Sequence, residues 1–272
     1  MSWIAAALLG VVQGLTEFLP VSSSAHLVLA RAFFGWNVDE GAFGLAFDVA
    51  LHVGTLVALV LYFWRDLLTI VAAAPSAMSA QRGPAKLARL IVVGTIPVVI
   101  VGVTLAKWLE EHLRTPPVIA VTLIVGGVWM LLAERLGSKD RTEDSLGNAG
   151  AFITGVAEST ALVPGMSRSG STISMAMLLG LTRESAARFS FILGIPATAA
   201  AAAKEGLHVL KSGVTAHDAA LFLVGMSVSA AVGYVTIRYF LKYLARHSLD
   251  VFAYYRIALA AVTVVWLFTR QA

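Results

Sequence analysis

The sequence contains no cysteine and few charged residues, and both absences restrict what the protein can be. Without cysteine the chain has no disulfide bonds and no thiol chemistry. Charged residues make up 13% of the 272 residues, whereas soluble domains carry about a quarter. With 58% hydrophobic residues and a mean hydropathy of +0.81, the composition excludes an ordinary soluble domain and predicts an integral membrane protein.

The first residues also lack the early lysine or arginine of a secretory signal peptide, so we expect them to belong to the mature protein. The formal net charge is +4 and the isoelectric point is near 9.5. A basic chain can bind nucleic acid, but here the basic residues lie in short loops between apolar segments, where membrane topology explains them better. We therefore expect no nucleic-acid partner.

Six apolar segments have about the length of membrane-spanning helices, which need roughly 20 residues. They comprise residues 47–64, 89–109, 118–133, 184–203, 219–240 and 251–268. We expect one membrane domain over residues 1–272, with halves at about 1–134 and 149–272 and a charged linker at about 135–148.

Two further apolar stretches are interrupted by polar residues and resemble each other. An offset of 145 residues superposes Gly10 on Gly155 and Ser22 on Ser167. Chance identity between apolar stretches is the alternative to duplication. Because an odd number of spans separates the two stretches, the second enters from the opposite side. The sequence therefore predicts an all-α polytopic membrane protein with six transmembrane helices and two re-entrant helical hairpins related by an inverted-topology repeat, an architecture that places sites near the bilayer midplane.

The second hairpin contains the densest cluster of hydrogen-bond donors, P-G-M-S-R-S-G-S-T at residues 164–172. Glycine lets the backbone approach a ligand closely, and Arg168 can hold a phosphate through paired hydrogen bonds. The run that follows looks helical, and a helix N-terminus favours an anion. We predict a phosphate cradle, with a polar loop outside the membrane as the alternative. The predicted substrate-binding residues are Ser22, Ser24, Gly165, Ser167, Ser169, Gly170 and Thr172.

Both hairpins also carry groups that can do chemistry. Gln13, Glu17 and Glu158 offer oxygen atoms that suit Mg²⁺ or Ca²⁺. His26 can move a proton near neutral pH, and a serine such as Ser23 can attack phosphorus once a base activates it. The attacking group stays open between a serine oxygen and a metal-held water.

Other polar residues are harder to interpret. Asp48 and His52 lie one helical turn apart, which is typical of a structural pair, although they could also support the site from behind. Arg188 is either an anchor at the end of a span or a further phosphate contact.

The motifs Q-x-x-x-E, at Gln13 and Glu17, and P-G-x-S-R-S-G-x-T, at residues 164–172, resemble those of the undecaprenyl pyrophosphate phosphatases of the bacitracin-resistance family. The resemblance implies a hydrolase of the bacterial plasma membrane with an outward-facing site and a divalent cation. Such an enzyme removes the terminal phosphate of a C55 polyprenyl diphosphate and recycles the lipid carrier of peptidoglycan synthesis. The family's proposed catalytic positions correspond to Glu17, Ser23, His26 and Arg168.

This sequence departs from the family pattern at Glu158, where we expect glutamine, so the number of metal ions stays open. The alternative function is a carrier or flippase for a polyprenyl phosphate, because inverted repeats with broken helices are typical of transporters. The number of subunits is also open, and a homodimer is one assembly compatible with the sequence.

The loop charges predict the orientation in the membrane. Thirteen lysines and arginines fall on one side and six on the other, and the richer side is cytoplasmic. The richer side holds Arg65, Arg82, Lys86, Arg89, Arg135, Lys139, Arg141, Arg183, Arg188, Arg238, Lys242, Arg246 and Arg256, and the other side holds Arg31, Lys107, Arg114, Lys204, Lys211 and Arg270.

The first prediction tests this orientation with single cysteines introduced into the cysteine-free chain. A cysteine in the loops at 65–89 or 134–145 should resist an impermeant thiol reagent in intact cells, whereas one at 204–217 should react. Permeabilised cells serve as the control for accessibility. Labelling of the Arg82 loop in intact cells would reverse the predicted topology.

Overall fold

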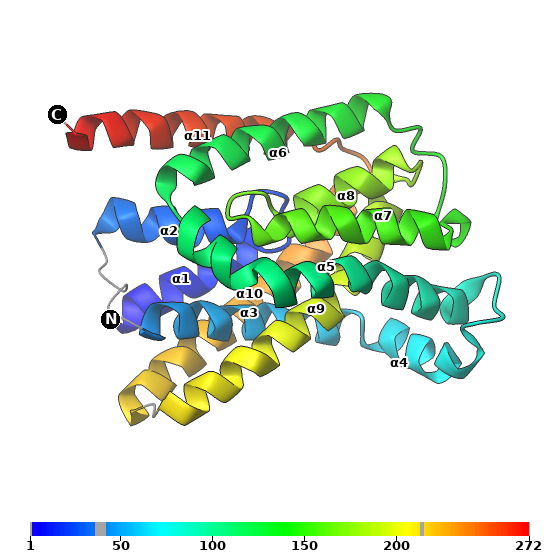
Figure 1. Cartoon of the computed structure of the whole chain (residues 1–272), viewed down its shortest axis with the longest axis horizontal. Coiled ribbons are helices and arrows are strands. Elements are labelled where there is room, and N and C mark those ends of the chain that lie inside the picture. The colour runs from blue at the N-terminus through cyan, green and yellow to red at the C-terminus, as the bar shows by residue number, and fades with distance from the viewer. Residues whose placement is uncertain (1, 36–41, 213–214, 272) are drawn as a thin grey trace.

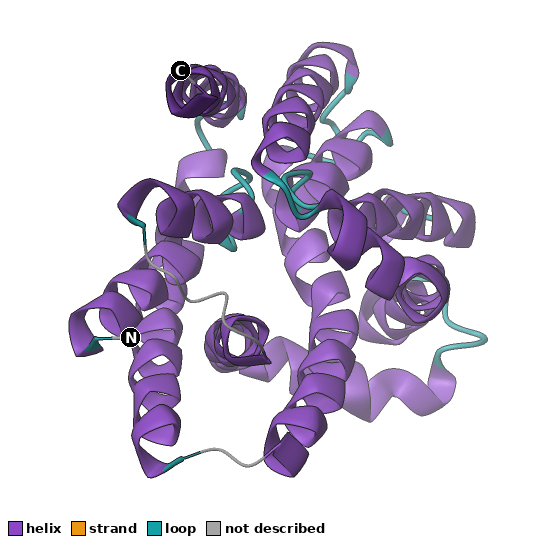
Figure 2. Cartoon of the chain, turned by 60° about the vertical axis from the view of Figure 1, so that its left-hand side comes forward, coloured by secondary structure: helices purple, strands orange, loops and turns teal. Residues whose placement is uncertain are grey.

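The computed structural model describes residues 2–35, 42–212 and 215–271, and the regular secondary structure of these residues is helical apart from one isolated β-bridge between Arg141 and Leu181 (Figures 1 and 2). The α-helices are α1 (Trp3–Thr16), α2 (Ser23–Phe34), α3 (Ala42–Tyr62), α4 (Trp64–Ala73), α5 (Gly83–Leu113), α6 (Pro116–Leu136), α7 (Asn148–Ser159), α8 (Arg168–Leu178), α9 (Arg183–Ser212), α10 (Ala216–Leu244) and α11 (Asp250–Gln271). Three short 3₁₀ helices, η1 (Ala74–Ser76), η2 (Glu143–Ser145) and η3 (Thr160–Leu162), lie between them.

Five of the described helices, α5, α6, α9, α10 and α11, are long and apolar enough to cross a membrane. The sixth predicted span, at 47–64, differs from the prediction because α3 ends at Tyr62 and the following helix is bent away by 76°. The bent pair brings the total to six if it counts as one span. In this bent position α4 packs against α5, and Asp66 near its start pairs with Arg188 of α9.

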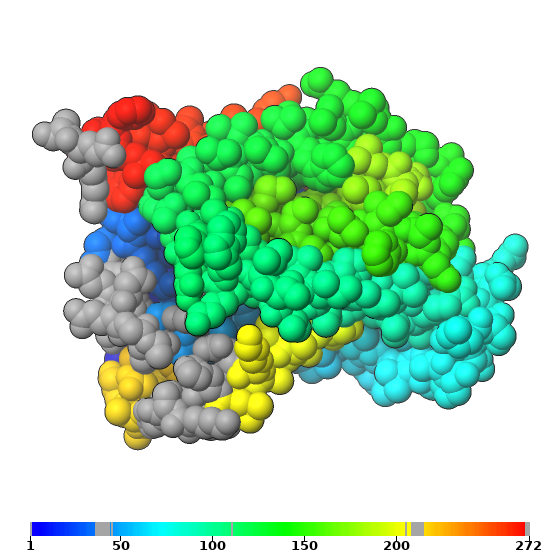
Figure 3. Space-filling model, in the orientation of Figure 1, coloured from blue at the N-terminus to red at the C-terminus, as the bar shows by residue number. Residues whose placement is uncertain are grey.

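The chain turns are gathered at two opposite ends of the helices. Figure 1 shows both termini and the α5–α6 turn at the left end, and the α4–α5 and α6–α7 links at the right end. The predicted linker forms the α6–α7 link and contains η2. The space-filling view shows α5 and α7 side by side on one face of the molecule (Figure 3).

The two short helix pairs, α1–α2 and α7–α8, have matching backbone features. Ser22 and Ser167, at φ 73° and 70°, are the N-caps of α2 and α8, and each hydroxyl accepts a hydrogen bond from the amide three residues later. Gly35 and Gly180 also share a positive φ, at 62° and 96°. Each of these two pairs is separated by 145 residues. The sequence correspondence therefore extends to unusual backbone conformations.

Glycines let each helix pair pack closely on a long helix. In the crossing of α1 with α10, a Cβ added at Gly10 would lie 2.7 Å from the carbonyl oxygen of Gly225. In the crossing of α7 with α5, a Cβ at Gly155 would lie 1.9 Å from the carbonyl oxygen of Gly94. Such close approach replaces the hydrophobic effect as a source of helix association inside a bilayer, where lipid tails are as apolar as side chains.

The second prediction concerns the α5–α7 crossing. Gly155→Ala forces two backbones apart and should destabilise the protein by about 1–3 kcal/mol, as overpacking does. Gly102→Ala is the matched control, because no described atom lies within 4 Å of its added Cβ, and a helical glycine replaced by alanine typically gains about 0.5–1 kcal/mol. Thermal unfolding in detergent, followed by tryptophan fluorescence, measures both. Equal melting temperatures of Gly155→Ala and Gly102→Ala would contradict the close crossing of α5 and α7.

Candidate functional site

The polar residues of the two hairpins meet where the loop after α1 lies beside the loop before α8 (Figure 1). Helices α2 and α8 both begin at this point, with Ser22 and Ser167 as N-caps. The predicted position of the cradle at a helix N-terminus is confirmed, since α8 begins at Arg168. Two positive helix ends are therefore directed at one small region.

Glu17 lies at the centre of this region and is only 8% exposed. Its Oε2 accepts hydrogen bonds from the Ser23 hydroxyl at 2.6 Å and from the Gln13 amide at 3.1 Å. Its Oε1 accepts one from Arg168 at 2.9 Å. A carboxylate that receives a serine proton and is itself oriented by other donors has the geometry of a base beside its nucleophile.

Arg168 connects the second hairpin to the first through its ion pair with Glu17. Its guanidinium packs directly against Gly194 of α9, where an added Cβ would lie 1.3 Å from Nη1. That Nη1 is buried and has no hydrogen-bond partner among the described residues. Arg168 therefore has one terminal nitrogen bonded to Glu17 and another buried beside Gly194 without a described partner.

Three of the predicted substrate-binding residues take part in internal hydrogen bonds. The Ser169 hydroxyl donates to the Leu19 carbonyl at 3.2 Å, which joins the two loops. Thr172 donates to the Arg168 carbonyl at 2.7 Å and also bonds Ser190 of α9. Ser167, besides capping α8, lies 3.3 Å from the Ser169 hydroxyl.

The remaining predicted binding residues shape the loops. The hydroxyls of Ser22 and Ser24 lie 3.2 Å apart. Gly165 has a φ of 95°, and a Cβ there would lie 1.9 Å from the Thr122 hydroxyl oxygen, so this turn has room only for glycine. The Gly170 amide donates to the cap of α8.

His26 is near the first loop but is directed away from Glu17. Its Nδ1 donates to the Ser22 carbonyl at 2.7 Å, and its Nε2 lies 2.7 Å from the hydroxyl of Tyr255, whose ring stacks on the imidazole. Both ring nitrogens are thus occupied. The sequence pattern missed Tyr255, because nothing near it in the sequence marks a site.

His52 is the imidazole that lies beside Glu17, with Nε2 3.6 Å from Oε2. Its Nδ1 donates to the Asp48 carbonyl at 2.7 Å, while the Asp48 carboxylate pairs with Arg31 and Arg114. Of the two interpretations of Asp48 and His52, the structure supports a structural role for Asp48 and places His52 at the site.

Glu158 is buried, and neither of its oxygens has a hydrogen-bond partner among the described residues. Arg168 makes its ion pair with Glu17 and not with Glu158. The described residues contain no cluster of three His, Cys, Asp or Glu that could hold a metal. The Oε1 of Gln13 is likewise buried without a described partner, so oxygen atoms that suit a hard cation remain unpaired.

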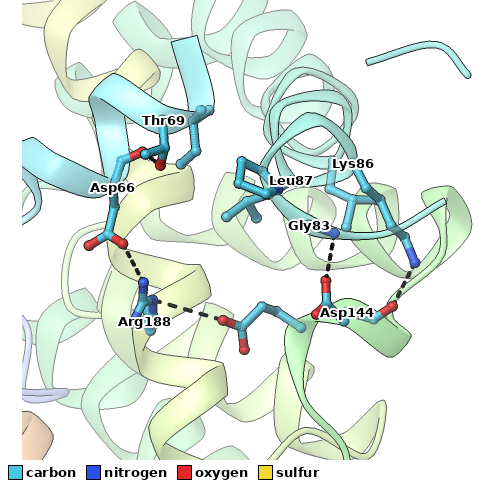
Figure 4. Close-up of a pocket in the computed structure, with 11 residues that line it drawn as sticks. Asp66, Thr69, Gly83, Lys86, Leu87, Asp144 and Arg188 are labelled. Carbon is cyan, nitrogen blue, oxygen red and sulfur yellow. Dashed lines mark hydrogen bonds and ion pairs between the residues drawn. The ribbon is translucent and has the colours of Figure 1, made fainter. Parts of the chain in front are cut away.

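Arg188 does not contact the cradle. It pairs with Asp66 and Glu143 in a charged pocket between α4, α5 and α9, where Lys86 and the Gly83 amide bond Asp144 (Figure 4). This arrangement agrees with the anchor interpretation of Arg188.

Arg256 was wrongly counted among the charges at the cytoplasmic ends of spans. It lies inside α11, is fully buried, and donates to backbone carbonyls and, at 4.0 Å, to the sulfur of Met130. Its partners are the carbonyls of Pro20, Thr122, Leu123, Gly165 and Met166, at 2.8–3.3 Å. The sequence does contain a signal for Arg256, because it lies several residues inside an apolar segment. Arginine is rarely found at such positions without a function.

These features define a class: an all-α polytopic membrane protein whose polar site is formed by two serine-capped helix ends and a glutamate–arginine ion pair. Residues 6–262 match the family model described as bacitracin resistance protein BacA. The chain belongs to this family.

Relatives named undecaprenyl-diphosphatase are similar over nearly the whole length. The protein from Rubrobacter xylanophilus is 46% identical over 266 residues, covering 96% of this chain and 97% of its own. Those from Geotalea daltonii and Moorella thermoacetica are each 43% identical, covering 98% of this chain and 99% of their own.

The third prediction separates the two carboxylates. Glu17→Gln should reduce phosphate release from a polyprenyl diphosphate by at least about a hundredfold, the lower range for loss of a general base, because it removes both the acceptor of the Ser23 proton and the charge paired with Arg168. Glu158→Gln should keep substantial activity, since Glu158 makes neither contact. Both variants are compared across a magnesium and calcium titration. The opposite ranking would reverse the two roles.

Proposed function

We propose that this chain is an undecaprenyl-diphosphatase that hydrolyses undecaprenyl diphosphate to undecaprenyl phosphate and inorganic phosphate. In this role it recycles the lipid carrier of peptidoglycan synthesis in the bacterial plasma membrane and contributes to bacitracin resistance. The names of its relatives support this function. The observation that carries it is the Ser23 hydroxyl held 2.6 Å from Glu17, which is in turn paired with Arg168 of the other hairpin.

The geometry favours Ser23 over water as the attacking group. Ser23 Oγ forms a bond to the terminal phosphorus while the bond from that phosphorus to the bridging oxygen breaks, and undecaprenyl phosphate leaves with the electron pair. Glu17 takes the hydroxyl proton. Water then attacks the phosphorus of the phosphoserine while the bond from phosphorus to Oγ breaks. Glu17 returns its proton to Oγ, and inorganic phosphate leaves with both protons of the water.

The second hairpin binds the charge that moves in this reaction. Arg168 directs a guanidinium to the same carboxylate that holds Ser23, so a phosphoryl group next to Ser23 is within its reach. The N-terminal amides of α2 and α8 add further positive potential. Fixed donors of this kind stabilise the transition state of phosphoryl transfer.

A divalent cation, Mg²⁺ or Ca²⁺, belongs to the same proposal. Gln13, Glu17 and Glu158 would hold it, and the unpaired oxygens of Gln13 and Glu158 suit a hard cation. When bound, it supplies positive charge that offsets the charge of the diphosphate.

The proposed architecture is an inverted repeat in which the two short helix pairs are re-entrant hairpins. Helices of 12–14 residues, such as α1, α2 and α7, are too short to span a bilayer. The shared positive φ values and the matching glycine crossings support the duplication. We further propose that the site opens outward, as the asymmetry of the remaining loop charges favours.

The carrier alternative needs the cradle but has no use for a base beside a serine. The hydrogen bond from Ser23 to Glu17 therefore favours hydrolysis.

The fourth prediction tests hydrolysis directly. Purified protein in detergent should release inorganic phosphate from undecaprenyl diphosphate, and a chelator should stop the release. Ser23→Ala should lower the rate by at least about a hundredfold, because no nucleophile remains. Ser174→Ala is the matched control, since that buried hydroxyl has no partner among the described residues.

Rapid acid quenching should trap phosphate covalently on Ser23 in the parent protein. Lipid movement without phosphate release would support the carrier instead. Full activity of Ser23→Ala would show that water, and not Ser23, is the attacking group.

A further inference from the structure

Arg256 combines a full positive charge with complete burial, and no described carboxylate pairs with it. A buried cation is costly unless it is well hydrogen-bonded. Here five backbone carbonyls supply the bonds. Gly126 of α6 makes room for the guanidinium, because a Cβ there would lie 1.9 Å from Nη2.

The carbonyls that Arg256 binds come from both hairpins. Nη1 donates to Pro20 of the first loop at 3.3 Å and to Met166 of the second loop at 3.1 Å. Nη2 donates to Gly165 at 2.8 Å and to Thr122 of α6 at 3.2 Å. One side chain of α11 therefore joins the two loops to each other and to a long helix.

The Pro20 and Met166 carbonyls lie one or two residues before the two strained residues of the site. Pro20 comes two residues before Ser22, and Met166 comes one residue before Ser167. Both serines have φ near 70°, which residues with a side chain rarely adopt and which persists only where the surroundings enforce it. Ser22 precedes Ser23, and Ser167 precedes Arg168, so the two strained residues direct the nucleophile and the phosphate-binding arginine.

We propose that Arg256 is a positioning residue that clamps both hairpin loops and so holds Ser23 in register with Arg168. It acts through the backbone and does not touch the substrate, because its side chain is fully enclosed. The catalytic consequence rests on the proposed hydrolase function, whereas the clamp itself does not.

The fifth prediction tests the clamp with two readouts. In Arg256→Met, kcat per folded molecule should fall at least tenfold while KM changes less than threefold. Amide hydrogen exchange, measured by mass spectrometry, should become at least tenfold faster in both loops, at residues 17–23 and 163–168. Arg256→Lys should recover only part of the kcat, because an ammonium presents its donors at one point and cannot bond both loops as a planar guanidinium does.

Arg183→Met is the matched control. Arg183 also makes several hydrogen bonds from a long helix, to Glu134, but lies outside the site. Its loss should lower thermal stability and leave both kcat and loop exchange unchanged. Gly126→Ala, which keeps the guanidinium but displaces it, serves if Arg256→Met does not fold, and should accelerate exchange in both loops.

Unchanged kcat and unchanged exchange in Arg256→Met, or in Gly126→Ala if only that variant folds, would overturn the proposal. Faster exchange in one loop alone would also overturn it, because a clamp must release both. If the parent protein releases no phosphate, the proposed function fails, and the exchange measurement still decides whether the clamp exists.

Discussion

Irregular backbone inside an apolar protein must find hydrogen-bond partners within the protein, and this constraint governs the whole site. The two helix pairs break at serine-rich loops, where amides and carbonyls are no longer satisfied by helix bonds. Serine caps satisfy the amides at the start of α2 and α8. Arg256 and Thr122 satisfy the carbonyls before them, the latter by donating to Pro164 at 2.7 Å. The groups left over are those available for chemistry.

The ion pair between Glu17 and Arg168 performs two tasks in this arrangement. It joins one hairpin to the other, and it orients the carboxylate that accepts the hydrogen bond of the Ser23 hydroxyl. Burial strengthens such a pair only if further donors complete it, and Gln13 and Ser23 do so. The absence of a side chain at Gly194 gives the guanidinium its place. Hence residues far apart in the sequence form one connected polar network.

Much of the fold could be predicted because the bilayer requires each span to be apolar and about 20 residues long, and both properties can be seen in the sequence. Five spans were predictable in this way, and the serine-rich motif predicted the helix that begins at Arg168. The bend after Tyr62 was not predictable, since no proline or glycine marks it in the sequence. Arg256 was misplaced and the role of His52 stayed open for the same reason, because both depend on which distant atoms these side chains meet. Periodicity carries no such information.

Arg256 also constrains how the protein can be made. An arginine at the centre of an isolated membrane helix costs about 2.5–3.5 kcal/mol on insertion scales, and α11 follows the other described helices in the sequence. All the carbonyls that bind this arginine belong to segments translated earlier, between Pro20 and Met166. Arg256 is therefore synthesised after all of these hydrogen-bond partners. When α11 packs against the rest of the protein, the carbonyls that accept from its arginine are already present.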